Sequence, residues 1–255
     1  MNNFSITLSD IGVMVKRNLI KYRRIPQLLI FSTIQPVMFL LLFTYVFGGA
    51  IKVGSLDYIN FLLPGILVQT VLFGAMQTGV GLADDVSRGM IDRFRSLPMA
   101  RSAVLAGRTI ADLLRNIFVI FLMTAVGFII GFRIENGFFN YLAAVSVISL
   151  FGFAFSWISA TIGLSVKNIE TAQVAGFIWV FPLAFGSSIF VPVDTMSSMI
   201  KTFATHNPIT YTVDTVRALT LGTPVGNNIW YAFAWIVGIM IVFVPLAVNR
   251  YRKIS

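Results

Sequence analysis

The chain has 255 residues, of which 57% are hydrophobic and only 11% are charged. Soluble domains carry about 25% charged residues, so this composition excludes a water-soluble fold and favours a chain solvated by lipid. Cysteine is absent and His206 is the single histidine, which excludes a disulfide framework, thiolate metal sites and motifs that need two histidines. We therefore expect no metal site and no cofactor bound by this chain.

Six long apolar segments predict six transmembrane helices. A spanning helix needs about 20 apolar residues to cross a hydrocarbon core roughly 30 Å thick. The segments are apolar on every face, whereas strands of a membrane barrel alternate with a period of two. The predicted fold class is therefore an all-α polytopic membrane protein. The predicted spans are 25–51, 57–84, 105–132, 135–167, 170–194 and 229–249.

The basic residues predict how the chain is oriented. Of the 19 Lys and Arg residues, 15 fall in the N-terminal segment, the loop between spans two and three, the loop between spans four and five, and the C-terminus. Cytoplasmic loops hold the excess of Lys and Arg. Both termini are therefore predicted to be cytoplasmic, in a multi-pass protein of the cell (plasma) membrane. The net charge of +9 is read as an orientation signal, and no nucleic-acid partner is expected.

Residues 4–24 are predicted to form an amphipathic helix along the cytoplasmic membrane surface. Apolar residues recur there at steps of three or four, and basic residues, including Lys16 and Arg17, gather in its second half. Two interpretations stay open, a membrane anchor and a surface that touches a cytoplasmic partner. The predicted apolar face consists of Phe4, Leu8, Ile11, Val15, Leu19 and Tyr22.

Residues 84–101 form the largest predicted cytoplasmic loop, and they show the pattern of a short helix that Pro98 ends. The helix has one apolar and one charged face. It is either a docking element or a solvated connector whose arginines only set topology, and physics alone slightly favours the connector. The apolar face is Val86, Met90, Phe94 and Leu97, and the charged face is Arg88, Asp92 and Arg95.

Residues 194–222, on the predicted outer side, indicate two helices too short to cross the bilayer. Asn207 and Pro208 break the chain between them, and Gly222 can end the second. Interrupted helices are stable within the membrane only when they pack against protein or line a cavity. We therefore expect either a pair of re-entrant helices or a cap outside the membrane. Asp194 is predicted to cap the first helix, whose face carries Met196, Met199, Ile200 and Phe203. Asp214 and Arg217, three residues apart, are predicted to pair.

Several chemistries are absent from the sequence. No Gly-Lys pair occurs, so the chain lacks a phosphate-binding loop and is not expected to hydrolyse ATP by itself. Ion-coupled carriers usually hold ionisable groups at mid-membrane, but spans one, two, four, five and six have none in their interiors. Arg108, Asp112 and Arg115 lie near the predicted cytoplasmic end of span three. Mutual pairing and snorkelling explain them, and a proton relay at Asp112 is the alternative. This scarcity of charge within the spans fits a transporter that is powered from outside the membrane better than an ion-coupled carrier.

Three runs of sequence carry a resemblance to a known family. They are LPGILVQTVLFGAMQTGVGLADDVSRGMIDRFRSLPMAR (63–101), FVPVDTM (190–196) and NPITYTVDTVRALTLG (207–222). Together, in order and over nearly the whole chain, they resemble ABC-2 type transporter permeases, closest to the daunorubicin-resistance-like drug-export permeases. The resemblance implies one ABC-2 type transmembrane domain over residues 1–255.

The resemblance implies partners and roles. It implies a second copy of this permease and separate ATP-binding cassette subunits that bind ATP and Mg²⁺. It also implies an ATPase-coupling helix in the cytoplasmic loop, an interface helix at 4–24 and an outer gate at 194–222. The implied coupling residues are Arg88, Asp92, Arg93, Phe94, Arg95 and Pro98; the implied gate residues are Asn207, Pro208, Asp214 and Arg217.

The leading hypothesis is the permease subunit of an exporter for a small amphipathic or hydrophobic, drug-like or antibiotic-like cargo. Export of a lipid or lipid-linked polysaccharide by the same architecture is an alternative, as are an ion-coupled secondary transporter and a non-transporting scaffold. Aromatic residues in spans one and five are the candidates for lining the pathway or facing lipid. They are Phe39, Phe43, Tyr45, Phe47, Phe177, Trp179, Phe181, Phe185 and Phe190.

Overall fold

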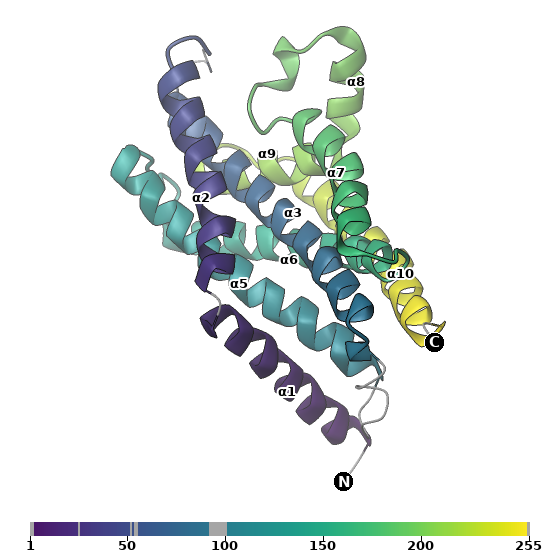
Figure 1. Ribbon diagram of the computed structural model, residues 1–255. Helices are drawn as coiled ribbons and strands as arrows, with labels where there is room; N and C mark the ends of the chain where they lie inside the picture. The colour runs from purple at the N-terminus through teal and green to yellow at the C-terminus, as the bar shows by residue number, and fades with distance from the viewer. Residues whose placement is uncertain (1–2, 25, 52, 54–55, 92–100, 254–255) are drawn as a thin grey trace.

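The computed structural model describes residues 3–24, 26–51, 53, 56–91 and 101–253. Nine α-helices make up most of this described part, which confirms the predicted all-α class (Figure 1). A π-helical turn, η1 (Phe43–Phe47), extends the second helix, and a 3₁₀ turn, η2 (Val193–Thr195), precedes the eighth. The α-helices are α1 (Asn3–Arg24), α2 (Pro26–Leu42), α3 (Tyr58–Ser87), α5 (Arg101–Ile130), α6 (Gly137–Gly163), α7 (Ile169–Phe185), α8 (Ser198–His206), α9 (Pro208–Leu221) and α10 (Asn228–Lys253).

Four helices are long and apolar enough to cross a membrane, namely α3, α5, α6 and α10. The apolar stretches Ser32–Phe47 and Ile169–Phe185 are shorter. At 1.5 Å per residue, the 17 residues of α7 rise about 26 Å. The chain turns at Gly186, whose N–H still donates to Pro182 O at 2.9 Å, so the predicted fifth span of 170–194 is longer than its helix. Four of the six predicted spans are thus confirmed as helices of spanning length, and the count of six stays a prediction.

Helix α3 lies at the centre of the bundle. Its apolar residues surround the helix, and most of it is buried, which is how a helix without a polar face behaves. It crosses α6 very closely, because a Cβ on Gly79 would lie 2.3 Å from Ser159 O and one on Gly163 would lie 2.1 Å from Gly79 O. The helix continues to Ser87, so the first residues of the predicted loop at 84–101 are its last turn.

Helix α1 packs along the first half of α5 (Figure 1). The two backbones approach closely at Gly107, where a Cβ would lie 2.4 Å from Met14 Cβ. Within the predicted apolar face of α1, Leu8 and Leu19 are 53% and 37% exposed, whereas Met14 and Asn18, which lie beside that face, are buried. The buried face is rotated toward Tyr22, which contacts a charged group on α5 described below. Of the other predicted face residues, Phe4 lies in the first turn of α1, Ile11 and Val15 are half-buried, Lys16 is exposed and Arg17 is half-buried.

The bundle has two chemically different ends. At one, α1 and the last turn of α10 share an apolar cluster that includes Met14 and Tyr251, and the end of α3 lies beside them; we call this the basic end. At the other, α9 packs on the start of α3 and α8 packs on α9; we call this the cap end. Figure 1 shows the two marked termini toward the same end and α8 at the opposite end.

The cap end contains the two short helices that the sequence predicts, joined at Asn207. The Asn207 side chain accepts from the N–H of Ile209, and Gly222 ends α9 with a φ of +76°. Asp194 does not cap α8, because the helix starts later, after Ser197. Asp194 lies instead in η2 and accepts a hydrogen bond from Lys201 Nζ at 2.7 Å.

Candidate functional site

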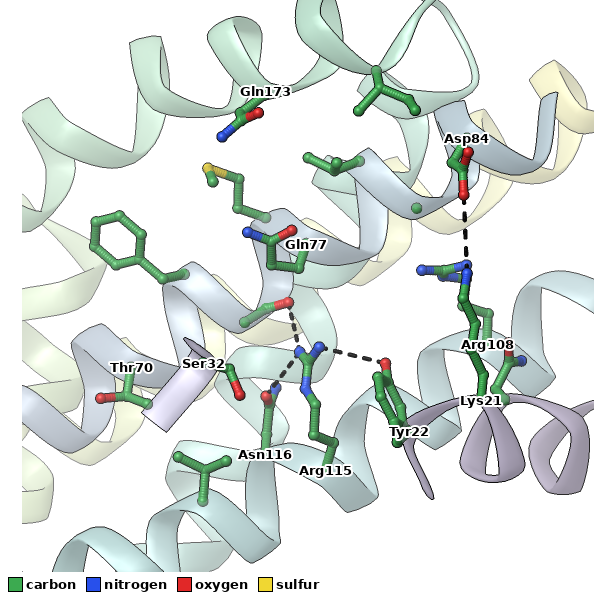
Figure 2. A pocket seen from close by; sticks show the side chains of 18 of the residues that line it. Lys21, Tyr22, Ser32, Thr70, Gln77, Asp84, Arg108, Arg115, Asn116 and Gln173 are labelled. Atoms are coloured by element: carbon green, nitrogen blue, oxygen red, sulfur yellow. Dashed lines mark hydrogen bonds and ion pairs between the residues drawn. The ribbon is translucent and has the colours of Figure 1, made fainter. Parts of the chain in front are cut away.

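A cavity of about 800 Å³ lies between α1, α2, α3, α5 and α7. Charged side chains line it at the basic end, and glutamine, threonine and phenylalanine side chains line it farther along the bundle. Figure 2 shows Lys21, Arg108 and Asp84 at one side and Gln77 and Gln173 at another. The cavity is therefore amphipathic, with the polar part near the end where the basic residues gather.

Asp112 is the centre of a buried network that joins α1, α3 and α5. It accepts hydrogen bonds from Tyr22 of α1 and, at 2.6 Å, from Thr78 of α3. Arg108 and Arg115 each lie 3.7 Å from its carboxylate. Burial, followed by the negative charge of Asp112, raises the pKa of Tyr22 to about 12, so this phenol stays a donor. Both carboxylate oxygens of Asp112 thus have partners, an arrangement that holds three helices together.

Arg115 links this network to the cavity. Its guanidinium donates to Gly74 O at 2.9 Å and to Asn116 Oδ1 at 3.2 Å, and it lies 5.4 Å from the centre of the Tyr22 ring. The Arg115 residue is only 8% exposed. Figure 2 shows the side chain rising from α5 toward Asn116, Tyr22 and the α3 backbone.

The two carboxylates that line the cavity, Asp84 and Asp85, are also paired. Asp84 accepts from Arg88 Nε at 2.5 Å and lies 3.9 Å from Lys21 Nζ. Asp85 accepts from Arg108 at 3.2 Å. Because Lys21 belongs to α1 and Asp84 to α3, this pair is a second link between the N-terminal helix and the end of α3.

Four amide side chains line the middle of the cavity, namely Gln35, Gln69, Gln77 and Gln173. They come from α2, α3 and α7. No hydrogen bond joins any of these four amides to another residue in the part of the chain that the structure describes. The sequence analysis did not single them out, although glutamines within apolar spans are a usable signal.

The aromatic residues predicted to line a pathway are only partly in the cavity. Phe39 and Phe177 line it, and Phe73, which was not predicted, joins them. Phe43, Phe47, Phe181, Phe185 and Phe190 continue from the cavity as a series of close ring contacts, whereas Trp179 lies against Phe155 and Tyr45 is 72% exposed. The successive pairs of this series, with ring centres 4.5–5.9 Å apart, are Phe73–Phe181, Phe177–Phe181, Phe181–Phe185, Phe185–Phe190, Phe190–Phe43, Phe43–Phe39 and Phe43–Phe47.

The predicted coupling residues lie mostly outside the described residues. Arg88 ends α3 and is exposed, and Gly89 follows with a φ of +64°, after which helical backbone resumes at Met90 and Ile91. Arg88 therefore belongs to the end of α3 and not to a separate loop helix. Asp92, Arg93, Phe94, Arg95 and Pro98 are not described.

The predicted gate residues are brought together at the cap end. Arg217 pairs with Asp214 at 2.8 Å, which confirms the prediction from their spacing. It also donates to Phe61 O at 3.1 Å and to Ser188 O at 3.0 Å, and its guanidinium carbon lies 3.7 Å from the Phe61 ring centre.

Asn207 supplies a second link at the cap end. Its Nδ2 donates to Leu183 O and Gly186 O at 2.8 and 2.7 Å. Pro208 is buried at the first position of α9, where its missing N–H costs no hydrogen bond. Together with Arg217, Asn207 holds α9 against the first turn of α3 and the last turn of α7.

Comparison of the sequence with known proteins identifies one matching family and several relatives. The ABC-2 type transporter family model matches residues 9–221. The daunorubicin resistance ABC transporter permease protein DrrB1 of Streptomyces coeruleorubidus is 34% identical over 237 residues, covering 93% of this chain and 84% of the relative. The probable doxorubicin resistance permease protein DrrC of Mycobacterium tuberculosis is 27% identical, covering 88% and 81%. The putative transport permease ycf38 of Cyanophora paradoxa is 28% identical, covering 83% and 74%.

Proposed function

This chain belongs to the ABC-2 type transporter family of membrane permeases, and we propose that it is the membrane-spanning subunit of an exporter driven by ATP that a separate subunit hydrolyses. The cargo is a small amphipathic or hydrophobic molecule, a class in keeping with the drug-resistance names of two relatives. The sequence itself contains no Gly-Lys pair for a phosphate-binding loop, so the energy comes from a partner.

The observation that carries this proposal is that α3 lines the cavity and ends at Arg88, where the predicted coupling segment, residues 88–98, begins in the sequence. The helix lines the cavity from Gln69 to Asp85 and leads directly into Arg88 and the residues that follow. It is held to α1 through Asp84 and through Thr78 and Asp112. A movement imposed on the coupling segment by an ATPase would therefore reach the cavity wall through one rigid helix.

The proposed topology has six spans with both termini in the cytoplasm of a cell whose plasma membrane holds the protein. The stretches Ser32–Phe47 and Ile169–Phe185 supply the two spans beyond the four longest helices. In this topology α8 and α9 form a re-entrant outer gate, because α9 is too short to cross but is mostly buried. The basic end then faces the cytoplasmic partner.

We expect a second copy of the permease to complete the pathway. Helices α2 and α7 flank the cavity, and both carry exposed apolar side chains, including Met38 and Ile178 at 58% and 70% exposure. Val46 of η1, which extends α2, is 65% exposed. In a membrane such a surface meets either lipid or another protein. A copy packed against α2 and α7 would place two cavities side by side.

The test is co-purification with the ATPase encoded nearest to this gene, followed by ATP hydrolysis in lipid with and without candidate drugs. We expect a stable complex whose hydrolysis is uncoupled from drug by Arg93→Glu with Arg95→Glu. The matched control is Arg250→Glu with Lys253→Glu, which reverses two charges at the end of α10 and should leave coupling intact. Absence of an ATPase complex in every lipid tested would contradict the proposal.

A further inference from the structure

The outer side of α1 combines positive charge with exposed apolar side chains. The helix lies on the outside of the bundle, with Met14 and Asn18 buried against the protein (Figure 1). It contains one carboxylate, that of Asp10, and five cations, all in its second half. A helix that mixes cations with exposed apolar side chains suits the surface of a membrane that contains anionic lipid. The cations are Lys16, Arg17, Lys21, Arg23 and Arg24, and the exposed apolar residues are Leu8, Val13, Leu19 and Ile20.

A surface groove of about 480 Å³ runs beside the second half of α1. The side chains of Arg17, Lys21 and Arg24 are separated by steps of three or four residues, so they lie on one side of the helix. Asn18 and Ile20 complete the lining in the part of the chain that the structure describes. The groove therefore offers a ligand three positive charges, and none of these lining residues is a carboxylate.

Two of the three cations of the groove are available to an anion. Lys21 Nζ lies 3.9 Å from Asp84 Oδ2, beyond hydrogen-bonding distance, and the Lys21 side chain is 41% exposed (Figure 2). Ion pairs at such exposure contribute little to stability, so Lys21 can turn to another anion at low cost. Arg24 is exposed, and its guanidinium forms no ion pair with any described residue. Phosphate oxygens accept strong charge-assisted hydrogen bonds from such groups.

The groove lies where the chain enters the membrane. Arg24 stands two residues before Pro26, the first residue of α2, and α2 continues into the apolar stretch Ser32–Phe47. Lipid phosphates lie just outside the hydrocarbon core, at the level of the ends of spanning helices. An acidic protein surface would also match the charge of the groove. The exposed side chains of Ile20 and Val13, two turns apart, favour a ligand that brings apolar chains with its phosphate.

We propose that the groove beside α1 binds the phosphate headgroup of an anionic phospholipid, in the leaflet that the basic end of the bundle faces. Lys21 and Arg24 donate to the phosphate oxygens, Arg17 adds positive potential, and Ile20 contacts the glycerol and the upper acyl chains. The bound lipid holds α1 on the membrane surface, next to its link with Asp84 of α3. This inference goes beyond the proposed function, because it concerns a resident lipid and requires only that the permease lie in a membrane.

The experiment measures lipid binding to the delipidated, full-length permease by native mass spectrometry. Phosphatidylglycerol and phosphatidylcholine with the same acyl chains are titrated separately. We expect phosphatidylglycerol to bind at least about tenfold more tightly, since each cation near an anionic headgroup contributes about fivefold. Equal binding of the two lipids would overturn the inference.

Two neighbouring variants separate a discrete site from diffuse surface charge. Arg24→Gln removes a cation that lines the groove, whereas Arg23→Gln removes an exposed cation that does not line it. Both variants have the same net charge. We expect Arg24→Gln to weaken phosphatidylglycerol binding about fivefold and Arg23→Gln to leave it unchanged. If both variants weaken binding equally, α1 attracts anionic lipid only through its overall charge, and the inference fails.

A competition measurement identifies the ligand as a lipid. Glycerol phosphate carries the same phosphate without acyl chains, and we expect it not to displace phosphatidylglycerol. Displacement at a similar concentration would make the groove a site for soluble anions and would overturn the lipid assignment.

These binding measurements need no ATPase, which separates the inference from the proposed function. A permease that binds phosphatidylglycerol as expected but never forms an ATPase complex would refute the proposed function alone. If Arg24→Gln abolished the ATPase complex and left phosphatidylglycerol binding unchanged, the groove would belong to the acidic surface of a partner protein, and the inference would be overturned.

Discussion

Replacing Asp112 by Asn is the sharpest test of how the cavity wall is held together. Asn keeps the size of the side chain and one acceptor oxygen, but it removes the charge that Arg108 and Arg115 share. Arg108 keeps Asp85 at 3.2 Å. For Arg115, Asp112 is the one carboxylate within 4 Å among the described residues, so this buried guanidinium loses its counter-charge.

The expected loss of stability follows from that arrangement. Leaving one partner of a buried ion pair uncompensated costs about 3–5 kcal/mol. Arg115 keeps its hydrogen bonds to Gly74 O and Asn116, so we expect the lower figure of about 3 kcal/mol. For a chain of this size 1 kcal/mol corresponds to about 2–4 °C, so the melting temperature should fall by roughly 6–12 °C.

Thermal unfolding in nanodiscs measures this effect, and a double variant isolates its cause. Arg115→Gln in the Asp112→Asn background removes the orphaned charge, so part of the lost stability should return, with a coupling of about 0.5–3 kcal/mol. A melting temperature within about 1 °C of wild type for Asp112→Asn would refute the structural role. If transport were then lost as well, a proton relay at Asp112 would be the better explanation, and the ion-coupled carrier would replace the ATP-driven exporter.

Three further predictions concern other parts of the bundle. Gly107→Leu should push α1 away from α5, because a Cβ there lies 2.4 Å from Met14 Cβ, and hydrogen exchange in α1 should accelerate; unchanged exchange would show that α1 is not held there. Arg217→Lys should lose at least one of three buried contacts at the cap end and about 1–3 kcal/mol, seen as a lower melting temperature, and equal melting would contradict this. The hydrogen bond from Lys201 lowers the pKa of Asp194 below 3.8. The contribution of this pair to folding stability is therefore complete above pH 3.8 and is lost as the pH falls through the lowered pKa of Asp194. Carboxylate NMR of Lys201→Met should show the pKa of Asp194 rising toward 3.8, and no change would exclude the pair in solution.

The sequence identifies the large features because they depend on local composition. Apolar windows predict helices wherever lipid is the solvent, and four of them are helices of spanning length. Asn207, Pro208 and Gly222 mark helix boundaries through backbone chemistry, and both boundaries are confirmed. The pairing of Asp214 with Arg217 follows from a spacing of three. Each of these predictions needs only neighbours along the chain.

Predictions fail where a residue's partner lies far away in the chain. The turn at Gly186 ends α7 early because Asn207, distant in sequence, donates to Leu183 O and Gly186 O. On α1, Tyr22 contacts Asp112 of α5, and Met14 and Asn18 are buried, which spacing along α1 could not show. Helical periodicity specifies which residues share a face of a helix. It does not specify which face of the helix packs against the rest of the protein.

The sequence by itself determined that the chain is helical and has apolar helices long enough to cross a membrane, because composition and local spacing carry that information. Only the tertiary structure showed that glutamines from α2, α3 and α7 converge on one cavity and that its carboxylates are already paired. The physical reason is that recognition depends on distances between side chains of different helices. Those distances are fixed by close approaches such as Gly79 with Gly163 and Gly107 with Met14.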